Sequence, residues 1–282
     1  MSIITLTTDF GLKDHFVGAL KGKLFSTIPK ATVIDISHNI DPFNTLQASY
    51  IVGAAYKSFP EGTIHIIGVD SEWSQTNKHL AVFWDNHFFV SADNGILSLL
   101  FKDKVPTKIV VLDVKDQNFD IETDLDIFVR AAKSIFENKN LNSLGTETAE
   151  IKQVTGTEAF VANDKKSIRG NIIYIDHFGN VVTNISKEIY QETAQNRAFE
   201  IPFRRLLNEK KATPITQIWN RYSEIVQSEN YDIKMYDGSK LAVFNEAGFL
   251  EIAIYKSNTN TGSAATLLGL GFRDNINIIF KD

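Results

Sequence analysis

Three aspartates of this 282-residue sequence, Asp9, Asp70 and Asp176, each end an apolar run of β-type residues. In open α/β sheets, ligands bind beyond the carboxyl ends of the strands, so each side chain would stand where a ligand is met. A carboxylate there can accept hydrogen bonds from hydroxyls or pair with an ammonium group. An acid at a strand end can equally cap the following turn. The local sequence leaves both roles open for Asp9.

The turn after Asp176 concentrates further polar and aromatic groups, because Phe178, Gly179 and Asn180 follow before the next apolar run. An acid, an aromatic face and an amide on one turn suit an ammonium or adenine ligand. A plain hairpin would be satisfied by the same composition. Both interpretations stay open at the level of these residues.

The sequence lacks the residues that several other kinds of functional site require. The chain has no cysteine, which excludes disulfides, thiolate metal sites and a cysteine nucleophile. The six histidines show no zinc-helix spacing, and Asp9, Asp14, Asp70 and Asp176 show no spacing typical of a magnesium site, so we expect no metal. No glycine-rich phosphate-binding motif occurs. The Asp-Phe-Gly tripeptide at 9–11 lacks the preceding kinase motifs.

Composition and charge narrow the class of partner. The chain has 29 Lys and Arg against 34 Asp and Glu, a net charge of -5, which does not suggest the basic face of a nucleic-acid-binding protein. No apolar run reaches the length of a membrane span, and the first residues enter a strand directly. We expect a soluble, cytoplasmic protein with a small-molecule substrate.

The elements that must position these side chains follow a regular order in the first half. Apolar runs at 3–8, 32–36 and 63–69 are separated by segments with helical spacing, which predicts a parallel sheet with right-handed crossovers. Two further runs around Asp85 and Asn86 predict a hairpin. The predicted fold class is α/β, with a mainly parallel sheet flanked by helices in residues 1–150.

The second half changes character. Residues 137–157 are polar and are interpreted as a linker. Short apolar runs separated by Gly, Asn and Asp then suggest a small barrel or sandwich, and we predict a smaller C-terminal β-barrel domain over 151–282. The stretch from about 190 to 228 is predicted to be a helical insertion.

Motifs spread over nearly the whole chain resemble the S-adenosylmethionine hydroxide adenosyltransferase family, relatives of the fluorinase and chlorinase enzymes that attack the 5′ carbon of the same molecule. Each motif is weak alone, and their shared order carries the resemblance. The matching stretches are 8–14, 36–43, 59–63, 69–70, 93–95, 126–128, 175–185 and 248–253.

The resemblance implies a homotrimer with S-adenosylmethionine bound at a subunit interface and no cofactor beyond this substrate. It implies that Asp9 binds the ribose hydroxyls and that Asp176 binds the methionine ammonium. Phe178 and Asn180 would line the adenosine or methionine end.

Four further residues complete the expected substrate-binding set: Asp14, Phe43, Trp73 and Glu246. Glu246 lies where relatives carry a serine-bearing loop. It is either a second acid for the ammonium group or an exposed turn residue, and the sequence favours neither.

The resemblance also implies a catalytic aspartate, here Asp70, beside an arginine and a histidine that surround the attacking water. In this chain Asn77 stands where the arginine is expected and Thr123 where the histidine is expected. An amide and a hydroxyl can orient a water but cannot stabilise hydroxide by charge. Lys78 or His79 could restore positive charge, since both adjoin Asn77.

The leading hypothesis is hydrolysis of S-adenosylmethionine to adenosine and methionine by water or hydroxide attack at the 5′ carbon, with Asp70, Asn77 and Thr123 as the catalytic set. A halide nucleophile is a variant of this hypothesis. The alternative is a non-catalytic protein that binds S-adenosylmethionine or adenosine and has lost turnover, which the missing arginine and histidine would explain.

Overall fold

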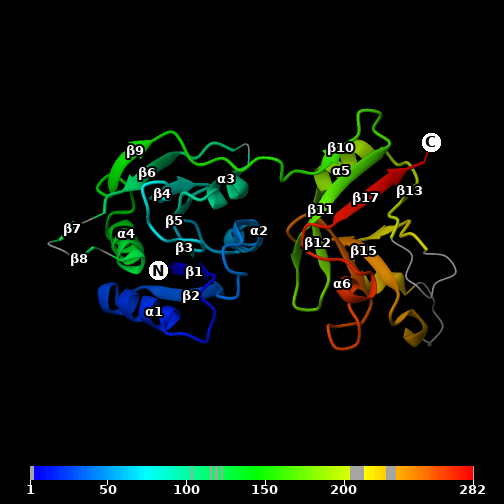
Figure 1. Cartoon of the computed structure of the whole chain (residues 1–282), viewed down its shortest axis with the longest axis horizontal. Helices are drawn as coiled ribbons and strands as arrows, with labels where there is room; N and C mark the ends of the chain where they lie inside the picture. Colours follow the sequence, from blue (N-terminus) through cyan, green and yellow to red (C-terminus); the bar gives the residue numbers. More distant parts are fainter. Residues whose placement is uncertain are drawn as a thin grey trace. The chain divides into compact units, whose positions relative to one another are not determined.

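The computed structural model describes residues 3–102, 104–114, 116–117, 120–121, 123–203, 213–226 and 233–281. The chain divides into two compact units, Met1–Val154 and Thr155–Asp282, and each contains its own sheet (Figure 1). Among the described residues, no helix combines the length and hydrophobicity that a bilayer crossing requires.

The sheet of the first unit has the strand order β2-β1-β3-β5-β4-β6-β9. Its strands are β1 (Ile3–Thr8), β2 (Thr32–Ser37), β3 (Ile64–Gly68), β4 (His79–Trp84), β5 (His87–Ala92), β6 (Lys108–Leu112) and β9 (Gly145–Thr148). A separate pair is formed by β7 (Asp116–Gln117) and β8 (Asp120–Ile121).

The prediction of a mainly parallel sheet is corrected to a mixed one. The pairs β1-β2, β1-β3 and β3-β5 are parallel, whereas β4-β5, β4-β6 and β6-β9 are antiparallel. Asp85 and Asn86 both have positive φ (49° and 61°), as a two-residue hairpin turn requires. This turn reverses the chain between β4 and β5, so the sheet continues antiparallel beyond that point.

Helices cover both faces of this sheet (Figure 1). Leu20 and Leu24 of one helix and Ile127 of another belong to one apolar core, and Ala48 and Ile96 belong to the core on the other face. The helical elements are α1 (Phe16–Thr27), α2 (Thr45–Ala55), the 3₁₀ helix η1 (Tyr56–Ser58), α3 (Ile96–Phe101) and α4 (Asp124–Asn138).

The second unit has a mostly antiparallel sheet in the order β13-β17-β11-β12-β16-β15-β14, with β10 paired to β11. The strands are β10 (Phe160–Val161), β11 (Ser167–Ile175), β12 (Val181–Ser186), β13 (Phe199–Glu200), β14 (Ile218–Trp219), β15 (Lys240–Phe244), β16 (Phe249–Ile254) and β17 (Asn275–Phe280). The helical elements are α5 (Lys187–Ala194), η2 (Tyr222–Ile225), η3 (Ile233–Tyr236) and α6 (Ala264–Leu267). The pairing of the described strands is an open path, and closure into a barrel stays a prediction.

Two local expectations differ from the structure. The predicted linker contains β9, which pairs with β6 at the edge of the first sheet. In the predicted helical insertion, α5 ends at Ala194 because Gln195 and Asn196 take left-handed conformations (φ 47° and 65°). The described remainder up to residue 226 contains two short strands and η2, while 204–212 and 227–228 lie outside the described residues.

Candidate functional site

Two of the predicted aspartates meet at the carboxyl edge of the first sheet. Asp9 directly follows β1, Asp70 is the second residue after β3, and these two strands are parallel neighbours. The backbone N–H of Asp9 donates to the carbonyl of Gly68 at 3.4 Å, which joins the two strand ends. The structure therefore brings these two residues together.

One carboxylate oxygen of Asp9 holds two loops. Its Oδ2 accepts hydrogen bonds from the backbone N–H of Phe43 (3.0 Å) and of Asp70 (3.2 Å). Both donors have left-handed backbones, with φ of 63° and 47°. Asp9 Oδ1 receives no hydrogen bond from any described residue, so this half-buried side chain keeps an acceptor for a ligand hydroxyl.

A buried histidine supports the turn around Asp9. Thr8 Oγ1 lies 2.7 Å from Nδ1 of His38, and Nε2 of the same ring lies 3.1 Å from Asp35 Oδ1, without the alignment of a hydrogen bond. Lys21 pairs with the other oxygen of Asp35 at 2.6 Å. Burial would raise the pKa of Asp35, but the contacts with Lys21 and His38 outweigh it and hold that pKa below its usual value.

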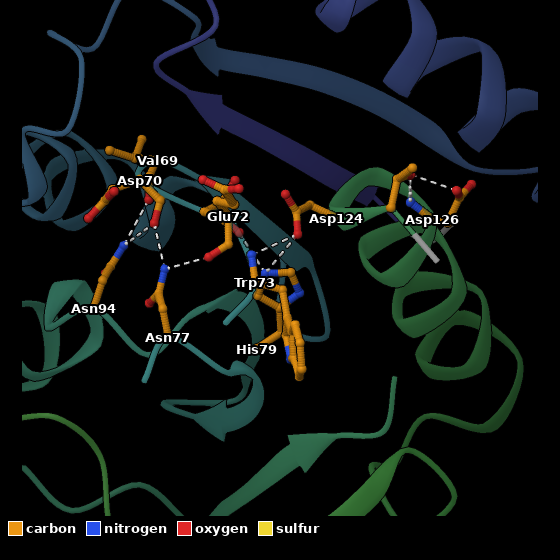
Figure 2. A network of polar contacts seen from close by, with 11 residues as sticks. Val69, Asp70, Glu72, Trp73, Asn77, His79, Asn94, Asp124 and Asp126 are labelled. Atoms are coloured by element: carbon orange, nitrogen blue, oxygen red, sulfur yellow. Dashed lines mark hydrogen bonds and ion pairs between the residues drawn. The ribbon is translucent and has the colours of Figure 1, made fainter. Parts of the chain in front are cut away.

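The backbone of Asp70 is held by amides (Figure 2). Its carbonyl oxygen accepts hydrogen bonds from Nδ2 of Asn77 (3.0 Å) and Nδ2 of Asn94 (3.1 Å). The carboxylate receives no hydrogen bond from the described residues. It is half-buried, so it is accessible to a water molecule.

Asn77, predicted to orient the water, uses its amide within its own loop. Nδ2 donates to the carbonyls of Asp70 and of Glu72, the latter at 2.9 Å. The Oδ1 atom is buried and receives no hydrogen bond from a described residue. Both N–H groups that could have faced a water are thus directed at the loop backbone.

Thr123, predicted to replace a catalytic histidine, is the N-cap of α4. Its exposed hydroxyl accepts from the backbone N–H of Asp126 (3.3 Å) and donates to Oδ2 of the same residue (2.6 Å). The hydrogen bonds from Lys23 and then from Thr123 lower the pKa of Asp126 against the opposing effect of burial. The hydroxyl is engaged in capping.

The loop after Asp70 is also tied to α4. The backbone N–H of Trp73 donates to Oδ1 of Asp124 at 3.0 Å, and His79 Nε2 lies 3.6 Å from the same oxygen (Figure 2). His79 is fully buried, contacts the Ser71 carbonyl through Nε2 at 2.7 Å and packs 4.8 Å from the ring of Phe128. This histidine is a core residue that joins loop and helix.

The remaining predicted residues of the first unit are accessible. Phe43 is 73% exposed, and Trp73 is half-buried. Asp14 and Lys78 are exposed, and the side chain of neither makes a hydrogen bond or ion pair with another described residue. The backbone N–H of Phe43 is bonded to Asp9 and that of Trp73 to Asp124 of α4, whereas Asp14 is hydrogen-bonded to neither Asp9 nor Asp70.

In the second unit, Asp176 organises the turn that carries the predicted aromatic residue. Its Oδ1 accepts from the backbone N–H of Phe178 (2.9 Å) and of Asn180 (2.8 Å), and its Oδ2 accepts from the Asn180 amide (2.9 Å). Gly179 has φ 77°, and a Cβ there would lie 2.3 Å from Ser263 Oγ. The turn is fixed, while the Phe178 ring is 57% exposed.

A buried acid near Asp176 was missed by the sequence analysis. Glu251 is 4% exposed and accepts hydrogen bonds from the hydroxyl of Tyr222 and from Asn245 Nδ2 (3.2 Å). Burial chiefly, with the Asp176 charge added, raises the pKa of Glu251 despite these hydrogen bonds. Glu246, the predicted second acid, is exposed, and its side chain makes no hydrogen bond with a described residue.

The signals for the missed residues were present in the motifs. Glu251 lies within the stretch 248–253, where its apolar neighbours made it look like an ordinary strand residue. Asn94 lies within 93–95, one of the stretches that carry the resemblance, and was assigned no role. In the structure its buried amide reaches the end of β3.

Comparison with known proteins gives the family. Models described as the SAM hydroxide adenosyltransferase N-terminal domain and C-terminal domain match residues 4–145 and 170–277, respectively. A protein of Methanocaldococcus jannaschii named (R)-S-adenosyl-L-methionine hydrolase is 25% identical over 99% of this chain and 97% of its own. One of the same name from Thermus thermophilus is 22% identical over 96% of each.

A solved structure shows the same fold. The crystal structure of an uncharacterized conserved protein from Thermotoga maritima matches with a TM-score of 0.79 and 24% identity, over 98% of this chain and 99% of that chain. The two family models together span most of the sequence, which confirms the resemblance seen in its motifs. The chain belongs to the S-adenosylmethionine hydroxide adenosyltransferase family.

Proposed function

We propose that the protein hydrolyses S-adenosylmethionine to adenosine and methionine, with Asp70 orienting the water that attacks the 5′ carbon. The observation that carries this proposal is the Asp70 carboxylate, which is accessible and not hydrogen-bonded by described residues while its backbone is held on both sides. Family membership and two relatives named as hydrolases of this molecule support the same reaction.

The main requirement that this reaction places on the protein is alignment of the water with the 5′ carbon. The bond between the 5′ carbon and the sulfonium sulfur breaks, a bond to the water oxygen forms, and methionine leaves as a neutral thioether that needs no acid. Asp70 accepts a hydrogen bond from the water and receives its proton as the oxygen attacks. Holding the water in line is the main contribution, because orientation of the reactants can lower the activation barrier by about 7–11 kcal/mol relative to reaction between free molecules.

Binding is proposed to use both units. Asp9 Oδ1 accepts from the ribose hydroxyls, and the exposed Phe43 ring and Trp73 offer apolar surface to the nucleoside. Asp176 with the exposed Phe178 ring takes the methionine ammonium or the adenine. Asp14 is retained only as a peripheral substrate contact.

Four proposals complete the arrangement. Asn180 fixes the turn that presents Phe178. Asn77 acts by holding the loop that carries Asp70, whereas Thr123 caps α4, because their polar atoms bond protein groups. Glu246 remains a candidate for the ammonium. The assembly proposed is a homotrimer with the substrate at a subunit interface, as the resemblance implies.

The test is product analysis with the purified protein and S-adenosylmethionine. Chromatography should show adenosine and methionine, whereas 5′-chloroadenosine in chloride buffer would indicate a halide nucleophile. Asp70→Asn should lower the rate on the order of 100-fold or more, as loss of a proton acceptor does. Glu147→Gln, which changes an exposed carboxylate paired with Lys108, is the matched control.

The alternative of a binding protein without turnover is tested by the same preparation. It would show calorimetric binding of S-adenosylmethionine without adenosine formation. Because Asn77 and Thr123 bond protein groups and carry no charge, this outcome has a structural basis, but the named relatives favour hydrolysis.

A further inference from the structure

Asp70 has a backbone conformation that most side chains avoid. Its φ of 47° lies in the left-handed region, and the peptide follows the fully buried end of β3. Residues in this region persist where surrounding groups hold them, and they concentrate at functional sites.

Side chains from three separate segments hold both polar backbone groups of Asp70. Asp9 Oδ2 accepts from its N–H at 3.2 Å. The amides of Asn77 and Asn94 donate to its carbonyl at 3.0 and 3.1 Å, which uses both lone pairs of that oxygen. The peptide is fixed while the carboxylate stays available.

Of the three side chains that bond the Asp70 backbone, Asn94 is the most firmly held by other hydrogen bonds. It is 8% exposed, its Nδ2 also donates to the carbonyl of Val69 at 2.8 Å, and its Oδ1 accepts from the N–H of Ile96 at 3.2 Å. A Cβ on the next residue, Gly95, would lie 2.2 Å from Val154. The amide is therefore fixed at the start of α3 and reaches the end of β3 (Figure 2).

Asn77 differs in what it connects. Its two hydrogen bonds both end on carbonyls of its own loop, at Asp70 and Glu72. Asn94 instead links the Asp70 peptide to Ile96 at the start of α3 and to the carbonyl of Val69, directly after β3.

We propose that Asn94 is a positioning residue for the hydrolysis, fixing the direction in which the Asp70 carboxylate meets the attacking water. This inference rests on the proposed function of Asp70. Asn94 bonds only protein groups, so its loss affects the chemical step and leaves substrate affinity unchanged. A misplacement of about 1 Å in a reacting group can cost on the order of 100-fold in rate.

The experiment compares Asn94→Asp and Asn94→Ala with the wild-type protein. Asn94→Asp is nearly isosteric and keeps the acceptor for Ile96, but it replaces both donors with an oxygen. Both variants should lower kcat on the order of 100-fold. KM and the calorimetric affinity for S-adenosylmethionine should stay within about threefold of wild type, the pattern of a group acting on the transition state.

Asn184→Ala is the matched control. Asn184 is 9% exposed and links backbones in the same manner, donating to the Thr157 carbonyl and accepting from the Asn171 N–H, both at 2.7 Å. This variant should keep the wild-type kcat. Circular dichroism at the assay temperature verifies that each variant is folded.

The result that overturns the proposal is a folded Asn94→Asp variant with kcat within about threefold of wild type, or with raised KM and unchanged kcat. If the wild-type protein forms no adenosine, the proposed function fails independently. Crystal structures of the wild type and Asn94→Asp then decide the positioning role. A change of the Asp70 φ to negative values supports it, and an unchanged positive φ overturns it.

Discussion

At the scale of single residues, Asp9 has a structural role, and we propose a binding role for the same side chain. Oδ2 bonds the N–H groups of two left-handed residues, Phe43 and Asp70, and Oδ1 is left for a ligand. The sequence placed Asp9 at a strand end and left these two roles as alternatives. The structure shows the structural role directly, and its geometry is compatible with the binding role at the same time.

Two substitutions at Asp9 separate the roles. In Asp9→Asn the remaining oxygen can still accept from both N–H groups, but the ligand-facing atom becomes a donor. We expect near wild-type stability and an affinity for S-adenosylmethionine lower by about tenfold or more, as for loss of a charge-assisted hydrogen bond. Asp9→Ala should in addition lower the free energy of unfolding by about 2 kcal/mol.

Calorimetry and urea denaturation measure the two effects of Asp9 separately. Wild-type affinity in Asp9→Asn would show that Oδ1 does not bind the ligand. Unchanged stability in Asp9→Ala would show that the two loop hydrogen bonds contribute little.

At the scale of elements, the parallel strands β1, β3 and β5 share a buried polar row. Thr5 Oγ1 lies 2.7 Å from His65 Nδ1, and His65 Nε2 lies 3.1 Å from His87 Nδ1. His65 stacks on Phe89 at 4.9 Å and is 1% exposed. Burial chiefly, and then the nearby His87, lower the pKa of His65 to about 3, and burial lowers that of His87.

These histidines should make the fold less stable in acid. Between the unfolded pKa of about 6.5 and the folded pKa, the unfolded chain binds the proton and the folded chain does not, so stability rises with pH and is lost as pH falls below about 6.5. At pH 5.5, His65 alone should lower the free energy of unfolding by about 1.4 kcal/mol relative to pH 7.5. His65→Gln should reduce the pH dependence of the free energy of unfolding. The control His15→Gln, which changes an exposed histidine, should not.

Urea denaturation at the two pH values checks the effect. An equal pH dependence in wild type and His65→Gln would contradict the assignment to the buried row. The quantity compared is the change in the free energy of unfolding between the two pH values, because His65→Gln also alters core packing and so shifts stability at both.

The cap of α4 gives a second test at this scale. Thr123→Ala should lower the free energy of unfolding by about 1 kcal/mol, as loss of an N-cap does, and Thr123→Ser should preserve it. The kcat of the folded Thr123→Ala variant should match wild type. A lower kcat with unchanged stability would instead place Thr123 beside the water.

Part of the fold and site could be predicted from the chain. Periodicity identified the strands ending at Asp9 and Asp70, and the Asp85-Asn86 pair identified the hairpin. The edge strand β9 was missed because it is polar and only half-buried, so it lacks an apolar pattern. The bonds of Asn77 and Asn94 to backbone carbonyls depend on loop conformation, which residue type and spacing do not encode.

At the scale of the whole molecule, each of the two units carries its own acidic groups. The first holds Asp9 and Asp70, and the second holds Asp176 and Glu251. Each unit has its own apolar core, so substitution in one half should leave the fold of the other intact. The proposed homotrimer would join halves from different subunits.

Mixed assemblies test this arrangement. Asp70→Asn and Asp176→Asn homotrimers should each have low activity. If equal amounts are dissociated and reassembled together, about a quarter of the interface sites combine two unmodified halves, and activity should return to about a quarter of wild type. No recovery in verified mixed trimers would place both aspartates of one site in the same subunit.

The most direct test of the account is hydrolysis in water enriched in ¹⁸O. The wild-type protein should convert S-adenosylmethionine to adenosine with one ¹⁸O at the 5′ oxygen, and Asp70→Asn should do so more slowly, on the order of 100-fold or more. Absence of labelled adenosine, or its formation by Asp70→Asn at the wild-type rate, would contradict the claim that Asp70 directs water at the 5′ carbon.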